Sequence, residues 1–262
     1  MAPSQQVRHG ADRPLGSRSH RGPRNDIQDI GARGMRLLAL DTASEACSVA
    51  LYLDGALRTC YEVAPRRHAE LILPMCDRLL AEAGLQVCQL DGVAFGRGPG
   101  SFTGVRIAAG ITQGIAFGAD LPVVPISSLA ALAQEVIARD GRPHVLVALD
   151  ARMKEVYWGA YRADDTGLAT LLGEEMVVAP AHVPLPKGRD WVGVGQGWKS
   201  YAESLNTRLH GRVGHRYPDR LPQAGYLIPL ALAALERGEF VSADQARPVY
   251  LRDKVTHRPT TV

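Results

Sequence analysis

The sequence predicts an α/β protein made of two related halves, each a mixed sheet covered by helices. From Arg36 onward, three apolar runs joined by short turns are followed by apolar runs that alternate with helical patterns, which is the order of a βββαβαβα unit. The start of this unit then recurs, because the tripeptide Ala-Leu-Asp at residues 39–41 reappears at residues 148–150. A chain of 262 residues with 46% apolar content can bury a core in each half.

In the first half, short apolar runs predict strands, and apolar residues spaced three and four apart predict helices. Asp54-Gly55 is the dipeptide of a tight hairpin turn between the second and third strands. Pro74 should bend or split the first helix. The expected strands are residues 37–40, 47–53, 57–63, 92–95 and 123–126, and the expected helices are residues 68–83, 101–118 and 128–139.

The second half repeats the first two strands and is less regular afterwards. At an offset of 109 residues, Tyr52 falls on Tyr161 and Ala50 on Gly159, so the second strands should superpose too. Further expected elements are a strand at 191–195, a helix that begins at Trp198, a helix at 226–236 and a tail at 248–252. The predicted organisation is an extension at residues 1–34, a first half at 35–142 and an abbreviated second half at 143–262.

Residues 1–34 are rich in Arg, Gly, Ser and Pro and nearly free of large apolar side chains, which is typical of disorder. We interpret them as a dispensable extension or the product of an upstream start codon, since the amphipathic stripe of a transit peptide is missing. They hold six arginines and three acids, so residues 35–262 are formally neutral although the whole chain carries +3. A neutral body argues against a large basic surface for nucleic acid.

The four cysteines, at positions 47, 60, 76 and 88, include no Cys-x-x-Cys pair. They are interpreted as buried or incidental thiols in a reducing compartment rather than as zinc ligands. No apolar run reaches the roughly 18 to 20 residues that a membrane span needs. The sequence therefore predicts a cytoplasmic protein that makes no membrane contact.

The most unusual stretch is residues 96–118, GRGPGSFTGVRIAAGITQGIAFG. A Gly/Pro-rich turn leads into a helix that Ser101 can cap. Within the helix, Gly110, Gly114 and Gly118 recur every fourth residue and share one face, beside a second small-residue row of Gly104 and Ala108. Each internal glycine costs about 1 kcal/mol relative to alanine, so a compensating gain is expected.

Two interpretations of this stretch stay open. In the first, the amides of Gly98, Gly100 and Ser101 form an anion cradle and the smooth stripe receives a partner helix. In the second, the glycines only permit close packing against the helix's own sheet. The turn is not a P-loop, because no Gly-Lys-Ser/Thr follows at the required spacing.

Two facing βββαβα halves, each with a first strand that ends in Asp, resemble the actin-like/Hsp70-like superfamily, which binds nucleotide between its halves. Five segments are similar to the TsaB (YeaZ) family: LLALDTAS at 37–44, HAELILP at 68–74, GPGSFTGVRI at 98–107, DARMKEVYWGAY at 150–161 and PVYLR at 248–252. The resemblance covers residues 35–255. It implies the bacterial subunit that partners TsaD in forming threonylcarbamoyladenosine on tRNA.

The resemblance also implies that this chain carries neither a metal site nor catalytic residues. The metal-binding histidines of TsaD correspond to positions near Ser128 and Leu132, and neither side chain ligates metal as imidazole does. The eight histidines include no pair four residues apart. His68 is expected to be a surface or helix-start histidine, because a lone His without an orienting partner is a poor general base.

By the same resemblance, Asp41, Thr42 and Asp150 occupy places where superfamily kinases hold phosphate and metal, and Gly195 and Gly197 lie where adenosine is contacted. The alternative is structural, since Asp and Thr commonly end strands and cap turns. The resemblance implies no tightly bound cofactor and allows ATP or ADP at the subunit interface.

The resulting hypothesis is a non-catalytic subunit that binds and activates TsaD through the helices at 68–83 and 101–118, with TsaE joining the complex. Without a partner, a homodimer through the same helices is expected, and tRNA is contacted only indirectly. The alternative hypothesis is an enzyme that acts alone, either an ATP-dependent carbamoyl-type transferase or a glycoprotease-like metalloenzyme. The predicted interface residues are His68, Leu71, Ile72, Met75, Ser101, Val105, Ala108, Gly110, Ile111, Gly114 and Gly118.

Overall fold

The computed structural model describes residues 34–252, so the predicted disorder of residues 1–34 falls almost wholly outside the described residues. The first sheet has the strand order β3-β2-β1-β4-β5. Strands β1, β2 and β3 are antiparallel neighbours, whereas β4 and β5 run parallel to β1. The strands are β1 (Arg36–Asp41), β2 (Ala46–Leu53), β3 (Ala56–Val63), β4 (Gly92–Gly96) and β5 (Val123–Ile126). Asp54 and Gly55 form the predicted hairpin turn, both with positive φ.

The second sheet repeats this plan with the order β11-β10-β6-β7-β8, and β9 also pairs with β7. Its first two strands are antiparallel, and β10 and β11 add in parallel. The strands are β6 (His144–Asp150), β7 (Val156–Ala163), β8 (Ala169–Leu171), β9 (Met176–Val178), β10 (Trp191–Val194) and β11 (Val213–Tyr217). The predicted fold class, two mixed sheets in duplicated halves, is confirmed.

The proposed alignment of the second strands is wrong by one residue. In the first half Ala39 pairs with Ala50, but in the second half Ala148 pairs with Trp158, and Gly159 pairs with Val147. Six residues separate the paired Asp41 and Ser48, whereas five separate the paired Asp150 and Val156, so the second hairpin closes one residue earlier. A one-residue change of register moves a side chain to the opposite face of a sheet, so Tyr161 is not the equivalent of Tyr52.

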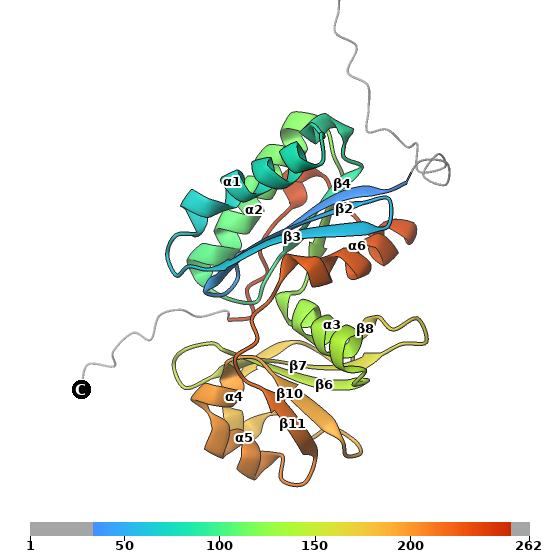
Figure 1. Ribbon diagram of the computed structural model, residues 1–262. Coiled ribbons are helices and arrows are strands. Elements are labelled where there is room, and N and C mark those ends of the chain that lie inside the picture. Colours follow the sequence, from blue (N-terminus) through green and yellow to red (C-terminus); the bar gives the residue numbers. More distant parts are fainter. Residues whose placement is uncertain (1–33, 253–262) are drawn as a thin grey trace, which may run out of the picture.

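The helices cover both faces of each sheet, and two of them cross between the halves (Figure 1). Helices α1 and α2 pack on one face of the first sheet, and α6 packs on the other. Helix α3 packs on the second sheet, opposite α4 and α5. The boundary predicted at 142/143 stays a prediction. Helix α3 belongs to the first half of the sequence but packs on the second sheet, and α6 belongs to the second half but packs on the first sheet. The helices are α1 (His68–Glu82), α2 (Phe102–Ala119), α3 (Ser128–Asp140), α4 (Gly197–Ser200), α5 (Ala202–Arg208) and α6 (Leu227–Glu236), with single turns η2 (Val87–Gln89), η3 (Pro180–His182), η4 (Ala224–Tyr226) and η5 (Ala243–Gln245).

Helix α1 contains Pro74 and continues through it, so of the predicted bend or split, the split does not occur. Pro74 lies on the exposed side of the helix, where water can satisfy the carbonyl group that loses its partner. Strands β8, β9 and β11 were not predicted, because the first two have only three residues each and β11 contains the polar sequence Gly-His-Arg.

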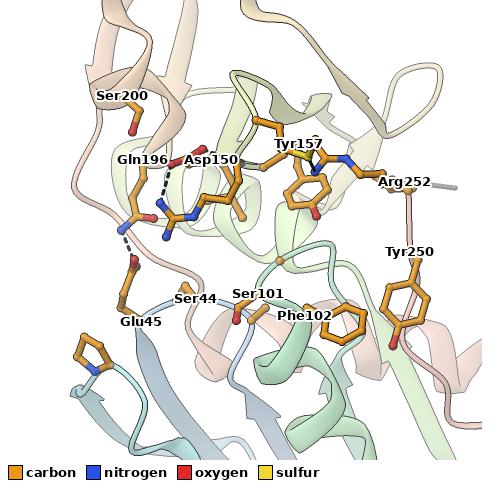
Figure 2. Close-up of a pocket in the computed structure, with 18 of the residues that line it drawn as sticks. Ser44, Glu45, Ser101, Phe102, Asp150, Tyr157, Gln196, Ser200, Tyr250 and Arg252 are labelled. Carbon is orange, nitrogen blue, oxygen red and sulfur yellow. Dashed lines mark hydrogen bonds and ion pairs between the residues drawn. The ribbon is translucent and has the colours of Figure 1, made fainter. Parts of the chain in front are cut away.

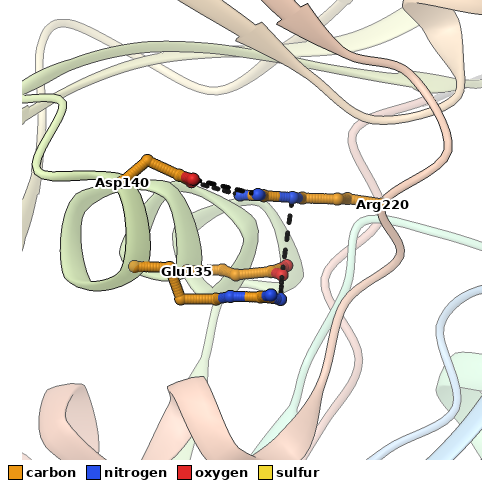
Figure 3. Close-up of polar contacts among 4 residues, drawn as sticks. Glu135, Asp140 and Arg220 are labelled. Atoms are coloured by element: carbon orange, nitrogen blue, oxygen red, sulfur yellow. Dashed lines mark hydrogen bonds and ion pairs between the residues drawn. The ribbon is translucent and has the colours of Figure 1, made fainter.

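A buried ion-pair network fastens the segment that returns from β11 to the first half (Figure 3). Arg220, in that segment, donates to both carboxylate oxygens of Asp140 at 2.5 and 3.2 Å and lies 3.6 Å from Glu135. Glu135 is only 1% exposed and also pairs with Arg139 at 2.9 Å. Burial raises the pKa of Glu135, while the arginines oppose that rise. The network attaches the crossing segment to α3 between the two sheets.

Three of the cysteines, Cys47, Cys60 and Cys76, are buried free thiols in the core between α1 and the first sheet, and Cys88 is exposed. Burial raises the pKa of Cys47 and of Cys76 to about 12, so these thiols are protonated and unreactive near neutral pH. Within residues 34–252, no helix has the length and apolar character to cross a membrane.

Candidate functional site

A cleft of about 1040 Å³ lies between the two halves (Figure 2). One wall comes from the turn after β1, the residues before α1 and the start of α2. The facing wall comes from the β6–β7 hairpin and α4, and the last described residues complete the rim. Glu45 and Gln196 meet across the cleft, where the amide donates to the carboxylate at 2.6 Å. The main polar and aromatic residues that line it are Ser44, Glu45, Arg66, His68, Ser101, Phe102, Arg106, Asp150, Arg152, Tyr157, Gln196, Lys199, Ser200, Tyr250 and Arg252.

Two predicted phosphate residues, Asp41 and Thr42, are fully buried and do not line this cleft. Asp41 accepts hydrogen bonds at 2.8 Å from the Ala43 amide and from the Ser128 hydroxyl. The Thr42 hydroxyl donates to the carbonyl oxygen of Gly104 at 2.7 Å. Both side chains hold α2 and α3 against the end of β1, which is the structural alternative for these residues.

Burial raises the pKa of Asp41 to about 6. The hydrogen bonds from Ala43 and Ser128 and the nearby His68 lower it, but they do not cancel the cost of desolvating a carboxylate. Asp41 is therefore a buried acid with a pKa of about 6, and its protonation is coupled to folding.

Of the other predicted nucleotide residues, only Asp150 reaches the cleft. It accepts from the Tyr201 hydroxyl at 3.0 Å and pairs with Arg152 at 3.2 Å. Gly195 and Gly197 serve close packing instead. A Cβ at Gly195, whose φ is +100°, would lie 2.5 Å from the Ala148 carbonyl oxygen, and a Cβ at Gly197 would lie 2.8 Å from Ala148.

One of the three amides in the predicted anion cradle already has a hydrogen-bond partner within the chain. The Ser101 amide donates to the carbonyl oxygen of Ala43 at 2.7 Å, so it is not free for a ligand. A Cβ at Gly100 would lie 2.3 Å from that same oxygen. Gly100 is therefore needed for the close approach of two backbone segments, and the Ser101 hydroxyl caps α2 as predicted.

His68 begins α1 as predicted, but it is buried and not on the surface. Its Nε2 lies 2.9 Å from the Ser44 carbonyl oxygen, so a ring N–H can donate there and attach α1 to the turn after β1. The positions that correspond to the metal ligands of TsaD, Ser128 and Leu132, are both buried in α3. Within the described part of the chain, no three His, Cys, Asp or Glu side chains gather in a way that would hold a metal ion.

The second candidate site is the outer face of α2, which we call the glycine face and define as Gly110, Gly114, Phe117 and Gly118. All four residues are exposed, and a Cβ added at any of the three glycines would meet no atom within 4 Å apart from the neighbouring backbone of its own helix. Phe117 is 84% exposed. The glycines are therefore not explained by packing against the chain's own sheet.

The second small-residue row packs inward. A Cβ at Gly104 would lie 1.9 Å from the Thr42 carbonyl oxygen, and Ala108 is fully buried. The two interpretations of the glycine-rich helix thus apply to different rows, with close intramolecular packing at Gly104 and an open surface at the glycine face.

Several of the predicted interface residues are buried within the chain itself. His68 is buried and lines the cleft. The side chains of Ile72, Met75, Val105 and Ala108 are covered by the chain's own core, so they cannot face a partner in this structure. Periodicity identified them as apolar helix positions, but the inward face of an amphipathic helix has the same period as an outward one. Ser101 is exposed, and Leu71 and Ile111 are half-buried beside the core.

Sequence reasoning missed Phe117 and Leu73, whose side chains are exposed on α2 and α1. Phe117 lies three residues after Gly114, so helical spacing alone could have placed it on the glycine face. The cleft residues Arg66, Arg106 and Tyr250 were also missed as site residues, because nothing in their local sequence indicates which segments meet at the cleft.

The two facing halves, each with three antiparallel strands followed by two parallel ones, define a protein of the actin-like class. Residues 61–203 match the family model of TsaD, tRNA N6-adenosine threonylcarbamoyltransferase. The chain is 42% identical over 224 residues to the tRNA threonylcarbamoyladenosine biosynthesis protein TsaB of Escherichia coli, which covers 84% of this chain and 96% of that protein. The corresponding protein of Haemophilus influenzae is 41% identical and covers 86% of this chain and 96% of its own length.

The solved structure of YeaZ from Pseudomonas aeruginosa is 49% identical, with a TM-score of 0.78, and covers 83% of this chain and 100% of its own. The chain belongs to the TsaB family.

Proposed function

We propose that this chain is a subunit of the machinery that forms N6-threonylcarbamoyladenosine on tRNA, and that it binds and activates a TsaD-family enzyme without performing the chemistry itself. The observation that carries the proposal is the glycine face, where three helical glycines and an exposed Phe117 meet nothing in their own chain. A helix surface on which three of the four residues have no side chain lets a partner helix approach closely, and this approach offsets the helix-propensity cost of the glycines. The pathway, threonylcarbamoyladenosine formation on tRNA, is inferred from membership of the TsaB family.

The partner is proposed to dock with its own equivalent helices. The segment of this chain that matches the TsaD family model includes α1 and α2, so we expect a TsaD-family protein to have a comparable surface. Two related surfaces can form a pseudo-symmetric interface, and two copies of this chain can form a symmetric one when the partner is missing. TsaE is proposed to join the complex in the cytoplasm, with ATP or ADP at the subunit interface and tRNA held mainly by the other subunits.

The alternative, an enzyme that acts alone, is favoured by no observation. Its predicted phosphate residues Asp41 and Thr42 are occupied by hydrogen bonds that organise α2 and α3, and Asp150 pairs with Arg152. A ligand cleft that performs chemistry needs convergent polar groups free to act on the substrate. Among the described residues of the cleft, no serine hydroxyl is hydrogen-bonded to a carboxylate or to His68, whose Nε2 lies 2.9 Å from the Ser44 carbonyl oxygen, so no activated nucleophile of the kind that covalent catalysis requires is formed there.

Reconstitution with purified components tests the proposal. We expect a TsaD-family enzyme, TsaE, tRNA, ATP and a threonylcarbamoyl donor to form the modified nucleoside only when this chain is added. We also expect this chain with the same substrates, but without TsaD, to form none. Product formed by this chain alone would contradict the non-catalytic role, and full product formation in its absence would contradict the subunit role.

A further inference from the structure

The last described segment, residues 248–252, runs from the first half to the second across the rim of the cleft. On the first half, the Val249 amide donates to the Arg97 carbonyl oxygen at 2.9 Å. Just upstream, the Gln113 side chain of α2 donates to the Ala246 carbonyl oxygen at 3.0 Å. These bonds hold the segment along α2 before it leaves the first half.

An aromatic and cationic cluster continues the attachment at the start of α2. The rings of Phe102 and Tyr250 have centroids 6.0 Å apart, and the guanidinium carbon of Arg106 lies 3.2 Å from the Phe102 centroid and 4.9 Å from that of Tyr250. Figure 2 shows Tyr250 beside Phe102, and Arg252 on the far side of the rim beside Tyr157. Phe102, Arg106, Tyr157, Tyr250 and Arg252 all line the cleft.

On the second half, Arg252 contacts the hairpin between β6 and β7. Its guanidinium group pairs with the Glu155 carboxylate and lies 3.1 Å from the Met153 sulfur. The hairpin tip is conformationally demanding, because Arg152, Met153 and Lys154 all have positive φ values, of 62°, 53° and 62°. Non-glycine residues keep such conformations only where neighbouring groups hold them.

We propose that residues 248–252 form a strap that holds the two halves together at the rim of the cleft, with the Arg252–Glu155 ion pair as its fastening on the second half. The side chains of that pair are 17% and 35% exposed, so the fastening is reachable by solvent and can be released without unfolding a core. Release frees the rim residues Tyr250 and Arg252 from the cleft and loosens the hairpin tip.

Three measurements on the full chain test the strap. Arg252→Ala and Glu155→Gln are each expected to speed hydrogen exchange of the Val249 amide about tenfold or more, and to speed trypsin cleavage after Arg152 and Lys154. Spin labels on the exposed Cys88 of the first half and on a Ser204→Cys variant of the second half are expected to report a broader, longer distance distribution. Arg237→Ala, which breaks an exposed pair with Glu239 at 2.8 Å, is the matched control and should change none of these.

The exchanged pair Arg252→Glu with Glu155→Arg should recover much of the wild-type behaviour. If Arg252→Ala leaves both the exchange rate and the label distances unchanged, there is no strap. If exchange and cleavage accelerate while the label distances stay the same, the contact is local and does not hold the halves. If the single substitutions change exchange, cleavage and label distances but the double exchange variant restores none of them, the Arg252–Glu155 ion pair is not the fastening.

Discussion

Gly114→Leu is expected to abolish stable binding to a TsaD-family partner while the isolated chain stays folded. Gly114 lies at the centre of the glycine face, and apart from the neighbouring backbone of its own helix no atom comes within 4 Å of the position that its Cβ would occupy. A side chain there meets no resistance in the monomer, and replacing a helical glycine stabilises an isolated helix by about 1 kcal/mol. The same side chain would hold a partner helix away from the close approach that the glycines allow. Size-exclusion chromatography of the mixture and thermal unfolding of the isolated variant measure the two effects.

Two control variants separate the interface from general effects of an added side chain. Gly114→Ala adds one methyl group and should weaken binding far less than leucine does. Ser204→Leu adds the same apolar side chain as the test variant at an exposed position of α5, away from α2, and should leave binding unchanged. Retention of the complex by Gly114→Leu would remove the glycine face from the interface.

Asp41→Asn is expected to change how stability depends on pH. Because the folded pKa of Asp41 is raised to about 6, the folded chain holds this proton more tightly than the unfolded chain does. The associated stability is fully present below pH 4 and is lost as the pH rises through 6. A neutral asparagine can accept from the Ala43 amide and does not ionise. The free energy of unfolding of the variant, relative to the wild type, should therefore rise by about 3 kcal/mol between pH 3.5 and 7.5.

Urea unfolding of both proteins at matched pH values measures this difference. Ser128→Ala sharpens the test, because it removes one of the hydrogen bonds that lower the pKa of Asp41 and should move the midpoint of the pH dependence upward. A difference between wild type and Asp41→Asn that is constant with pH would show that Asp41 does not titrate in this range in the folded chain.

Much of the fold was predictable because its signals are local. Apolar periodicity located the strands of the first half, Asp54-Gly55 identified the hairpin, and Ser101 identified the start of α2. The exchange of α3 and α6 between the halves was not predictable, because both helices are apolar on the sides that pack and nothing in either pattern specifies the sheet.

The sites were less predictable for a related reason. Spacing showed that Gly104 and Gly110 belong to different rows of one helix, but only the structure shows that one row meets the Thr42 carbonyl and the other is open. Asp41 ends a strand as predicted, yet its role depends on Ser128, which lies 87 residues away. Residues far apart in the chain form the cleft, and no spacing in a single sequence indicates that they meet.

Hydroxyl-radical footprinting of Phe117 tests the central claim most directly, because this exposed ring should become buried when a TsaD-family partner binds the glycine face. The ring is 84% exposed in the isolated chain and is expected to oxidise readily. On adding the partner, we predict that oxidation of Phe117 falls sharply while oxidation of Leu185, exposed on the second half, is unchanged. If a complex forms and Phe117 is oxidised as fast as before, the partner binds elsewhere and the glycine face is not the interface.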